Sequence, residues 1–293
     1  MTVGATLPRR LLGRQLAELR EQAGITMAAA AAAIAVGKST LWRIETGQQV
    51  RLNPVLLERL CQLYGAAPEV TSALLGLIEE TKTNGWWCAF TDTIPKDFGL
   101  FVGLEDSANR LTSYQTTFLP GLLHTPEYRR ALIWLELPNA PADEVERTLA
   151  GGLQRQARLT DDRNPLDMDV LIDESVLRRV TGSTSVMAEQ LRHLDAVSQR
   201  PNVSIRVVPA AIGTYKGLIV GSFVLLEFPR HPKADLSTPP VVYVQGYTGD
   251  LYLEKPSEIA QYREVRAEIG RRALDNKDSR ALIREIAEEY ESA

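Results

Sequence analysis

The 293-residue sequence contains few of the residues from which reactive sites are built. It has two cysteines, Cys61 and Cys88, and three histidines, His124, His193 and His231. Two cysteines are too few for a disulfide framework or a structural zinc site, so we expect both to be buried, reduced thiols. The histidines lie far apart without helical pairing, which excludes a zinc site of the HExxH type. The sequence therefore predicts no metal and no other cofactor.

Motifs of other enzyme classes and of membrane proteins are also missing. There is no G-x-S-x-G elbow, no phosphate-binding loop and no G-x-G-x-x-G after a strand. No apolar stretch is long enough to span a bilayer, and no apolar signal segment with a cleavage site begins the chain. The acid pairs Asp161-Asp162 and Asp173-Glu174 fit a helix end and a solvated turn better than a catalytic dyad. We therefore expect a cytoplasmic protein that is not an enzyme.

The most informative pattern lies near the N-terminus. Residues 11–22 place leucines at helical spacing, and Gly24 follows as a helix C-cap. Thr26 can cap a second helix that runs through the alanines of residues 27–34. A tight turn with a glycine leads to a third helix over residues 38–45. Two short helices joined by such a turn form a helix-turn-helix, whose second helix enters the major groove of DNA.

This segment resembles the DNA-binding domain of the lambda-repressor-like (XRE) regulators. The matching residues are Leu19-Arg20, Gly24-Ile25-Thr26, the run 30–36, Ser39-Thr40-Leu41 and Arg43-Ile44-Glu45-Thr46-Gly47. The resemblance implies an all-α, five-helix N-terminal domain, which helices predicted over residues 53–64 and 68–83 complete. Asn84-Gly85 ends this pattern, so we place the two domains at residues 1–84 and 85–293.

The resemblance also implies which residues contact double-stranded DNA. Positions matching Lys38, Ser39 and Arg43 touch base edges, and Arg43 is the strongest candidate because a guanidinium can bind guanine O6 and N7 together. Trp42 contacts a thymine methyl group or the sugar–phosphate wall, or it folds back onto the fourth helix; the sequence leaves this open. The predicted interface comprises Thr26, Met27, Lys38, Ser39, Thr40, Trp42, Arg43, Thr46, Gln48 and Arg51.

The resemblance implies a structural role for two residues of the segment, and a third departs from the family pattern. In similar domains, the positions of Arg20 and Glu45 form a partly buried ion pair that joins the first helix to the third. Met27 stands where the family usually has glutamine, and methionine donates no hydrogen bond, which puts one phosphate or base contact in doubt. The backbone N–H groups at the start of the second helix remain suited to a phosphate.

Charge is distributed unevenly along the chain. Residues 1–65 carry eight basic and four acidic side chains, whereas the rest carries 25 basic and 33 acidic ones. A basic N-terminal segment followed by an acidic remainder is typical of a DNA-binding domain attached to a second domain. A DNA-binding domain with few phosphate contacts usually binds as a dimer across two half-sites, so we expect a homodimer.

The remainder of the sequence predicts an α+β domain with a mixed or antiparallel sheet. Strand-like runs rich in valine, isoleucine and leucine occupy residues 169–172, 203–208, 222–228, 241–245 and 251–253. Helices are expected over residues 100–113, 126–137, 143–160, 185–199, 257–274 and 278–289. Asp278 or Ser279 can cap the last of these helices.

This second domain resembles the uncharacterised C-terminal domain of a large actinobacterial regulator family described as antitoxin-like. The matching strings are Gly85-Trp86-Trp87, Gly103-Leu104-Glu105, Leu119-Pro120-Gly121-Leu122-Leu123, Thr125-Pro126-Glu127-Tyr128, Arg155-Gln156-Ala157-Arg158-Leu159, Ile172-Asp173-Glu174, Gln190-Leu191 and Gly221-Ser222-Phe223. Where this chain has His124, the family often has glutamine. The resemblance implies a transcription regulator, commonly encoded beside a small partner protein.

Two main hypotheses for function follow, beside a third in which the C-terminal domain has lost or hidden an enzymatic activity. In the first, the chain is a transcription regulator whose activity is set by a partner protein or a small-molecule effector. In the second, it is an antitoxin-like module that sequesters a small partner protein and regulates its own operon. An effector or partner site could be built from aromatic residues with a polar group, although the alternative is that these residues are core. The candidate residues are Trp86, Trp87, Glu105, Tyr114, Phe118 and Tyr128.

Overall fold

The computed structural model describes residues 6–48, 50, 52–80, 98–161, 166–229, 237–247 and 249–293. Backbone contacts divide the chain into two compact units. The first unit, which we call the head, comprises Met1–Ser107 with Pro229–Thr238, and the second comprises Ala108–Phe228 with Pro239–Ala293. The boundary predicted near residue 85 lies outside the described residues. Each unit is considered by itself below.

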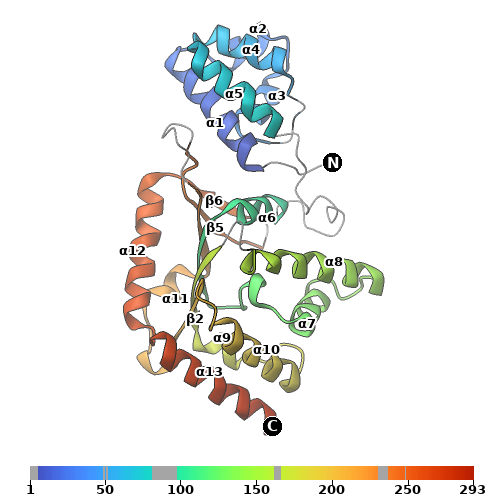
Figure 1. The fold of residues 1–293 in the computed structure, drawn as a ribbon, viewed down its shortest axis with the longest axis vertical. Helices are drawn as coiled ribbons and strands as arrows, with labels where there is room; N and C mark the ends of the chain where they lie inside the picture. Colours follow the sequence, from blue (N-terminus) through green and yellow to red (C-terminus); the bar gives the residue numbers. More distant parts are fainter. Residues whose placement is uncertain are drawn as a thin grey trace. The chain divides into compact units, whose positions relative to one another are not determined.

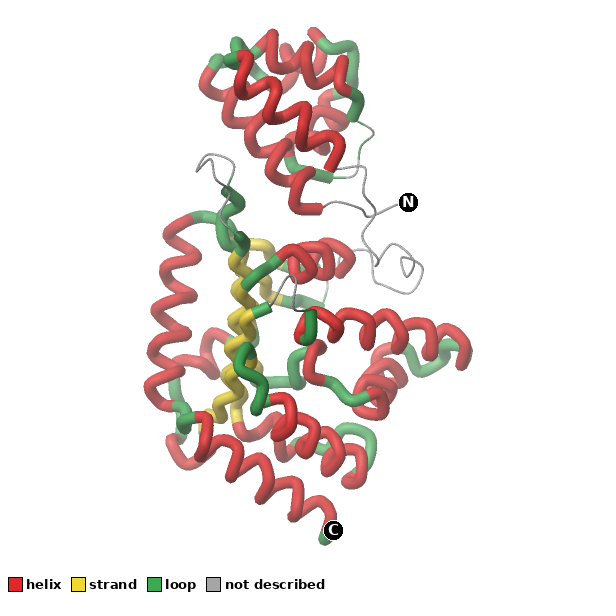
Figure 2. The backbone as a smooth tube through the Cα atoms, viewed as in Figure 1, coloured by secondary structure: helices red, strands yellow, loops and turns green. Residues whose placement is uncertain are grey.

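The head contains only helices and loops in its described part (Figure 2). Its helices are α1 (Thr6–Gln22), α2 (Met27–Ala33), α3 (Lys38–Glu45), α4 (Pro54–Leu63), α5 (Pro68–Glu80) and α6 (Phe98–Ser107). Polar side chains fix two of the helix starts. Thr26 Oγ1 accepts a hydrogen bond from Ala29 N at 3.2 Å, and Asn53 Oδ1 accepts one from Leu56 N at 2.7 Å. The predicted five-helix N-terminal domain, α1 to α5, is confirmed.

The core of the head draws one or more leucines from each of four helices. Leu16 of α1, Leu41 of α3, Leu57 of α4 and Leu74 of α5 are all fully buried. The buried positions recur every three or four residues, so each helix turns one apolar face inward. Cys61 joins this core as a free thiol, as predicted, and burial raises its pKa. Cys88 lies outside the described residues.

The second unit is built on one six-stranded mixed sheet, which confirms the predicted α+β class. Its strands are β1 (Arg110–Gln115), β2 (Asp167–Asp173), β3 (Val203–Val208), β4 (Phe223–Glu227), β5 (Val241–Val244) and β6 (Leu251–Leu253). Their spatial order is β3-β2-β1-β4-β5-β6. The strands β1, β2 and β3 run parallel, whereas β4, β5 and β6 pair antiparallel. Parallel neighbours need crossover connections, and helices supply them here.

Helices cover both faces of the sheet (Figure 1). They are α7 (Pro126–Glu136), α8 (Ala142–Arg155), α9 (Glu174–Arg178), α10 (Thr184–Val197), α11 (Lys216–Val220), α12 (Pro256–Arg272) and α13 (Asn276–Glu291). In the view of Figure 1, α12 lies on one side of the sheet, and α7, α8 and α10 lie on the other. Ile259, Val265 and Ile269 of α12 are buried against sheet residues. The sheet is therefore the middle layer of three.

One predicted helix and one unpredicted strand require correction. The helix expected over residues 100–113 ends at Ser107, and residues 110–115 form β1. The sequence of β1, RLTSYQ, has no valine or isoleucine, so its composition did not indicate a strand. Its pairing with β2 on one side and β4 on the other makes it a central strand. Here tertiary hydrogen bonding overrides local propensity.

Two predictions about polar side chains were also wrong. The cap of α13 is Asp275, whose Oδ1 accepts a hydrogen bond from Asp278 N at 2.8 Å. Ser279 is instead buried, and its hydroxyl accepts a hydrogen bond from Val207 N at the edge of β3 (2.9 Å). The turn at residues 173–174 is not solvated, because Glu174 is buried and bound by Ala210 N at 2.8 Å.

His124 is a buried neutral side chain in the second unit. Its Nε2 lies 2.8 Å from the carbonyl oxygen of Leu119, to which the neutral ring donates a hydrogen bond. Its Nδ1 is buried and has no hydrogen-bond partner among the described residues. Burial lowers the pKa of His124 to about 3, and the nearby charges of Arg129 and Arg155 act in the same direction.

This burial predicts a loss of stability in mild acid. The unfolded chain, with an ordinary histidine pKa of 6.5, takes up the proton before the folded chain does. The stabilising effect is therefore complete above pH 6.5 and declines as the pH falls toward 3, by about 2 kcal/mol at pH 5. The His124→Gln variant should lose most of this dependence, because an amide donates to Leu119 without titrating. Urea unfolding at pH 7 and pH 5, followed by Trp134 fluorescence with the other three tryptophans replaced by phenylalanine, measures the difference.

A control addresses the second described histidine. Burial also lowers the pKa of His193, so a His193→Gln variant should remove part of the acid sensitivity. If His124→Gln unfolds with the same pH dependence as the unmodified protein, the assignment of a neutral, buried His124 is wrong.

Candidate nucleic-acid interface

The turn between α2 and α3 sets the direction of the third helix. The chain leaves α2 at Ile34, and Ala35 adopts a left-handed conformation with φ of 56°. Gly37 then takes an extended conformation as the N-cap of α3. A non-glycine residue with positive φ is uncommon, and alanine has the smallest side chain that could adopt it. This turn lets two short helices meet at an angle, as in a helix-turn-helix.

Helix α3 has a buried face and an exposed face. Leu41 and Ile44 are buried in the core of the head. Lys38, Ser39 and Arg43 are exposed, and Thr40 is half-buried. Trp42 is 49% exposed, which is unusual for a tryptophan on the surface of a small helical domain. The exposed side of α3 thus carries two cations, a hydroxyl and a large aromatic ring.

No negative charge interrupts the exposed side of α3. The only acidic residue of this helix, Glu45, is buried and forms a two-bond ion pair with Arg20 of α1. Arg20 Nε donates to Glu45 Oε1 at 2.8 Å, and Arg20 Nη2 donates to Oε2 at 2.9 Å. Arg20 Nη1 also donates to the carbonyl oxygen of Ile25 at 3.1 Å. One guanidinium therefore joins α1, α3 and the turn before α2.

Two glycines allow α1 to approach the end of α3 closely. A Cβ atom on Gly13 would lie 2.6 Å from the carbonyl oxygen of Glu45 and would also collide with the Ile44 carbonyl oxygen. Gly47 has φ of 70°, and a Cβ atom there would lie 2.6 Å from Cα of Arg10. Sequence reasoning named Gly47 as the end of the third helix and as part of the string that matches the regulator family, and it missed Gly13. The only feature of the sequence that could have indicated this close approach is the glycine itself, a small residue inside the first predicted helix.

Comparison with known protein families agrees with this geometry. A family model described as a domain of unknown function, DUF5753, matches residues 98–285. The chain belongs to the DUF5753 family. A second model, described as a helix-turn-helix domain, matches residues 11–74. No curated protein matches the sequence.

This member of the DUF5753 family therefore joins an XRE-like helix-turn-helix to an uncharacterised C-terminal domain, as the resemblance implied. The helix-turn-helix indicates a DNA-binding regulator.

None of the helices in the described ranges has the length and hydropathy that crossing a membrane requires. Within those ranges, histidine, cysteine and acidic side chains form no group of three or more suited to a metal ion.

The remaining predicted DNA-binding residues lie outside α3, at the start of α2 and after the end of α3. Thr26 and Gln48 are exposed, whereas Met27 packs partly against the core. The Thr46 hydroxyl donates to the carbonyl oxygen of Trp42 at 2.8 Å and so caps the end of its own helix. Arg51 lies outside the described residues.

The described effector candidates of the second unit, Tyr114, Phe118 and Tyr128, differ in their surroundings. Tyr114 is fully buried, and its hydroxyl lies 2.7 Å from that of Tyr215, which in turn donates to Asp173 Oδ2 at 2.7 Å. Tyr128 is buried elsewhere, with its ring centre 4.9 Å from that of His124. Glu105 on α6 is buried and Phe118 is partly exposed. Trp86 and Trp87 lie outside the described residues.

Proposed function

We propose that this protein is a sequence-specific transcription regulator that inserts α3 into the major groove of double-stranded DNA. The observation that supports this most strongly is the composition of the exposed face of α3. That face presents Lys38, Ser39, Trp42 and Arg43, while the one carboxylate of the helix is buried against Arg20. A cationic, solvent-facing helix following a tight turn fits the groove and its phosphate walls.

Arg43 is the residue expected to select the sequence. It is exposed on the face of α3 opposite Leu41 and Ile44. From this position its guanidinium can reach a guanine and bind O6 and N7 together. Lys38 and Ser39 are exposed in the first turn of α3, which supports a contact with the adjacent base or phosphate. Trp42 offers an apolar surface for a thymine methyl group.

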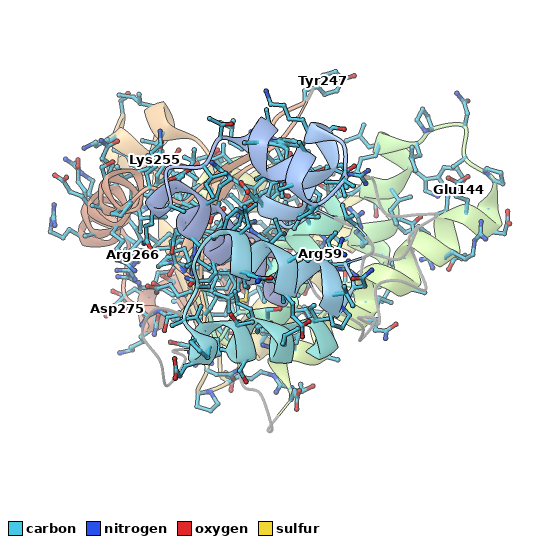
Figure 3. The ribbon with its side chains drawn as sticks, turned by 90° about the horizontal axis from the view of Figure 1, so that it is seen from above. Arg59, Glu144, Tyr247, Lys255, Arg266 and Asp275 are labelled. Atoms are coloured by element: carbon cyan, nitrogen blue, oxygen red, sulfur yellow. The ribbon has the colours of Figure 1, made fainter. Side chains whose placement is uncertain are left out.

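The Arg43→Ala variant should remain folded and bind its preferred duplex about 10- to 100-fold more weakly, which corresponds to about 1–3 kcal/mol. The preferred duplex is first selected from a random pool with the unmodified protein, and affinities are then compared by gel shift at fixed salt. Arg59→Ala is the matched control. Arg59 is an exposed arginine on α4 (Figure 3), so its loss changes the net charge equally without altering α3.

Two results would contradict the proposed groove contact. One is full affinity in the Arg43→Ala variant, and the other is an equal loss in the Arg59→Ala variant. The salt dependence provides an independent check, because the affinity of the unmodified protein should fall steeply as salt rises. Loss of a base contact leaves that slope almost unchanged, whereas loss of a phosphate contact reduces it.

The proposal includes a homodimer whose activity responds to an effector or a partner protein. One head supplies few phosphate contacts, and two heads bound one helical turn apart would span about 34–36 Å of duplex. Selected sequences should then contain an inverted repeat, which mirrors the two-fold symmetry of the dimer. The second unit is where an effector or a partner protein would bind, because α3 and its supporting helices all belong to the head.

A further inference from the structure

The sheet face that α12 covers is divided into an apolar part and a polar part. Residues paired directly across neighbouring strands point to the same face. Toward the C-terminal ends of the parallel strands this face carries Tyr114, Leu171 and Val208, which pack with the buried residues of α12. At the opposite ends it carries Arg110 and Asp167, which pair across β1 and β2, followed by Asp169, Ser204 and Arg206.

A cavity of about 400 Å³ lies at this polar end. It is lined by the polar residues of β1, β2 and β3, by Arg266 of α12, and by Asp275 and Asn276 at the start of α13. Figure 3 labels Arg266 and Asp275 on the same side of the unit. The volume is in the range of small-molecule sites. All of its lining residues belong to the second unit.

Some of the lining groups hold the fold together. Arg266 forms an ion pair with Asp169, which is buried, and this pair attaches α12 to the sheet. Ser204 Oγ donates to Asn276 Oδ1 at 3.0 Å and attaches the start of α13 to β3. Because Asp169 and Arg266 pair with each other, neither charge is available to a ligand.

Two other lining charges, Arg206 and Asp275, have no charged partner among the described residues. Arg206 is half-buried and donates to the carbonyl oxygen of Gly270 at 3.1 Å, but no described carboxylate lies within 4.0 Å of it. Asp275 accepts the Asp278 N–H, and no described cation lies within 4.0 Å of its carboxylate. Arg110 differs from these two residues, because it forms ion pairs with Asp167 and Glu227, each at 3.8 Å. The cavity thus offers both a cation and an anion that the protein does not pair together.

We propose that this cavity binds a small zwitterion, specifically a free α-amino acid, with its carboxylate on Arg206 and its ammonium group on Asp275. A purely anionic ligand would face the carboxylates of Asp167 and Asp275, and a purely cationic one would face Arg110 and Arg206. A ligand with both charges satisfies both groups, and charge-assisted hydrogen bonds are the strongest kind available here. Only the role of this ligand as an effector depends on the proposed DNA-binding function.

The experiment measures thermal unfolding of the full-length protein with each standard amino acid in turn at millimolar concentration. At least one amino acid should raise Tm saturably, by roughly 5 °C or more when it is far above its Kd. Its N-acetyl derivative lacks the ammonium group and its methyl ester lacks the carboxylate, so neither should raise Tm. Inorganic phosphate, the probe for a simple anion site, should also have no effect.

Three variants connect the response to the cavity. Asp275→Asn should abolish it while keeping the helix cap, because asparagine caps helices as well as aspartate does. Arg206→Gln should abolish it as well. Arg263→Gln is the control, because Arg263 of α12 pairs with Glu227 and does not line the cavity.

Four results would overturn the proposal. They are the absence of any response to an amino acid, an equal response to the blocked derivatives, a response to phosphate alone, and an undiminished response in Asp275→Asn. The Arg43→Ala variant separates this proposal from the one about DNA. It should lose the preferred duplex and keep the amino-acid response, so a failure of one proposal is visible apart from the other.

Discussion

We expect the Arg20→Leu variant to lose about 3–5 kcal/mol of head stability, because it leaves the Glu45 carboxylate buried without its counter-charge. The Glu45 side chain is only 3% exposed, and both of its oxygens accept hydrogen bonds from Arg20. The same substitution removes the donor to the Ile25 carbonyl oxygen. A loss of this size approaches the whole stability of a small domain, so the variant should bind no DNA.

A double substitution distinguishes this structural role from a DNA contact. Arg20→Leu combined with Glu45→Leu removes both charges and fills the space with apolar side chains, so most of the stability should return. DNA binding should return with it, because neither residue belongs to the exposed face of α3. Urea unfolding followed by Trp42 fluorescence, with the other three tryptophans replaced by phenylalanine, measures the head separately. A double variant as unstable as Arg20→Leu would contradict this account of the ion pair.

The second large effect is expected at Gly13. The Gly13→Ala substitution should destabilise the head by about 2–3 kcal/mol, since the added methyl group collides with two backbone carbonyl oxygens that cannot move independently. These carbonyls belong to Ile44 and Glu45, at the end of α3. The helix that carries the proposed DNA-binding face would therefore shift relative to α1, and affinity for DNA should fall as well.

Gly76 provides the matched control for this prediction. It lies inside α5, and a Cβ atom placed on it meets no heavy atom within 4 Å beyond its own helix. Gly76→Ala should stabilise the head by up to about 1 kcal/mol, because alanine loses less backbone freedom in a helix than glycine does. Urea unfolding of the two variants in parallel tests the contrast. Similar effects in both would show that the contact between α1 and α3 does not limit the residue at position 13.

Local sequence signals predicted most elements of the chain well. The bounds of α3 agree with the prediction because a capping glycine, a periodic apolar face and a terminating Thr46-Gly47 all coincide. Strands rich in valine and isoleucine, such as β3, were found for a similar reason. The strand β1 was missed, because its sequence is polar and its position between β2 and β4 depends on residues far away in the chain.

One candidate site could be predicted from local sequence, and the other could not. The exposed face of α3 could be predicted because all of its residues lie on one short helix, whose periodicity determines which side chains face outward. The polar cavity could not be predicted, because Arg110, Arg206, Arg266 and Asp275 come from four separate elements. Their spacing in the sequence carries no periodic signal. Of the aromatic residues that the sequence suggested for an effector site, Tyr114 and Tyr128 are buried, which agrees with the alternative that they are core residues.

The sequence by itself therefore determined the helix-turn-helix, the α+β class of the second unit and the side chains on the outer face of α3, because these depend on interactions between residues close together in the chain. The tertiary structure decided the place of β1, the close contact at Gly13 and the grouping of charges beside α12. These depend on which distant segments meet, and the loop-closure entropy and side-chain packing that govern such meetings leave no local pattern.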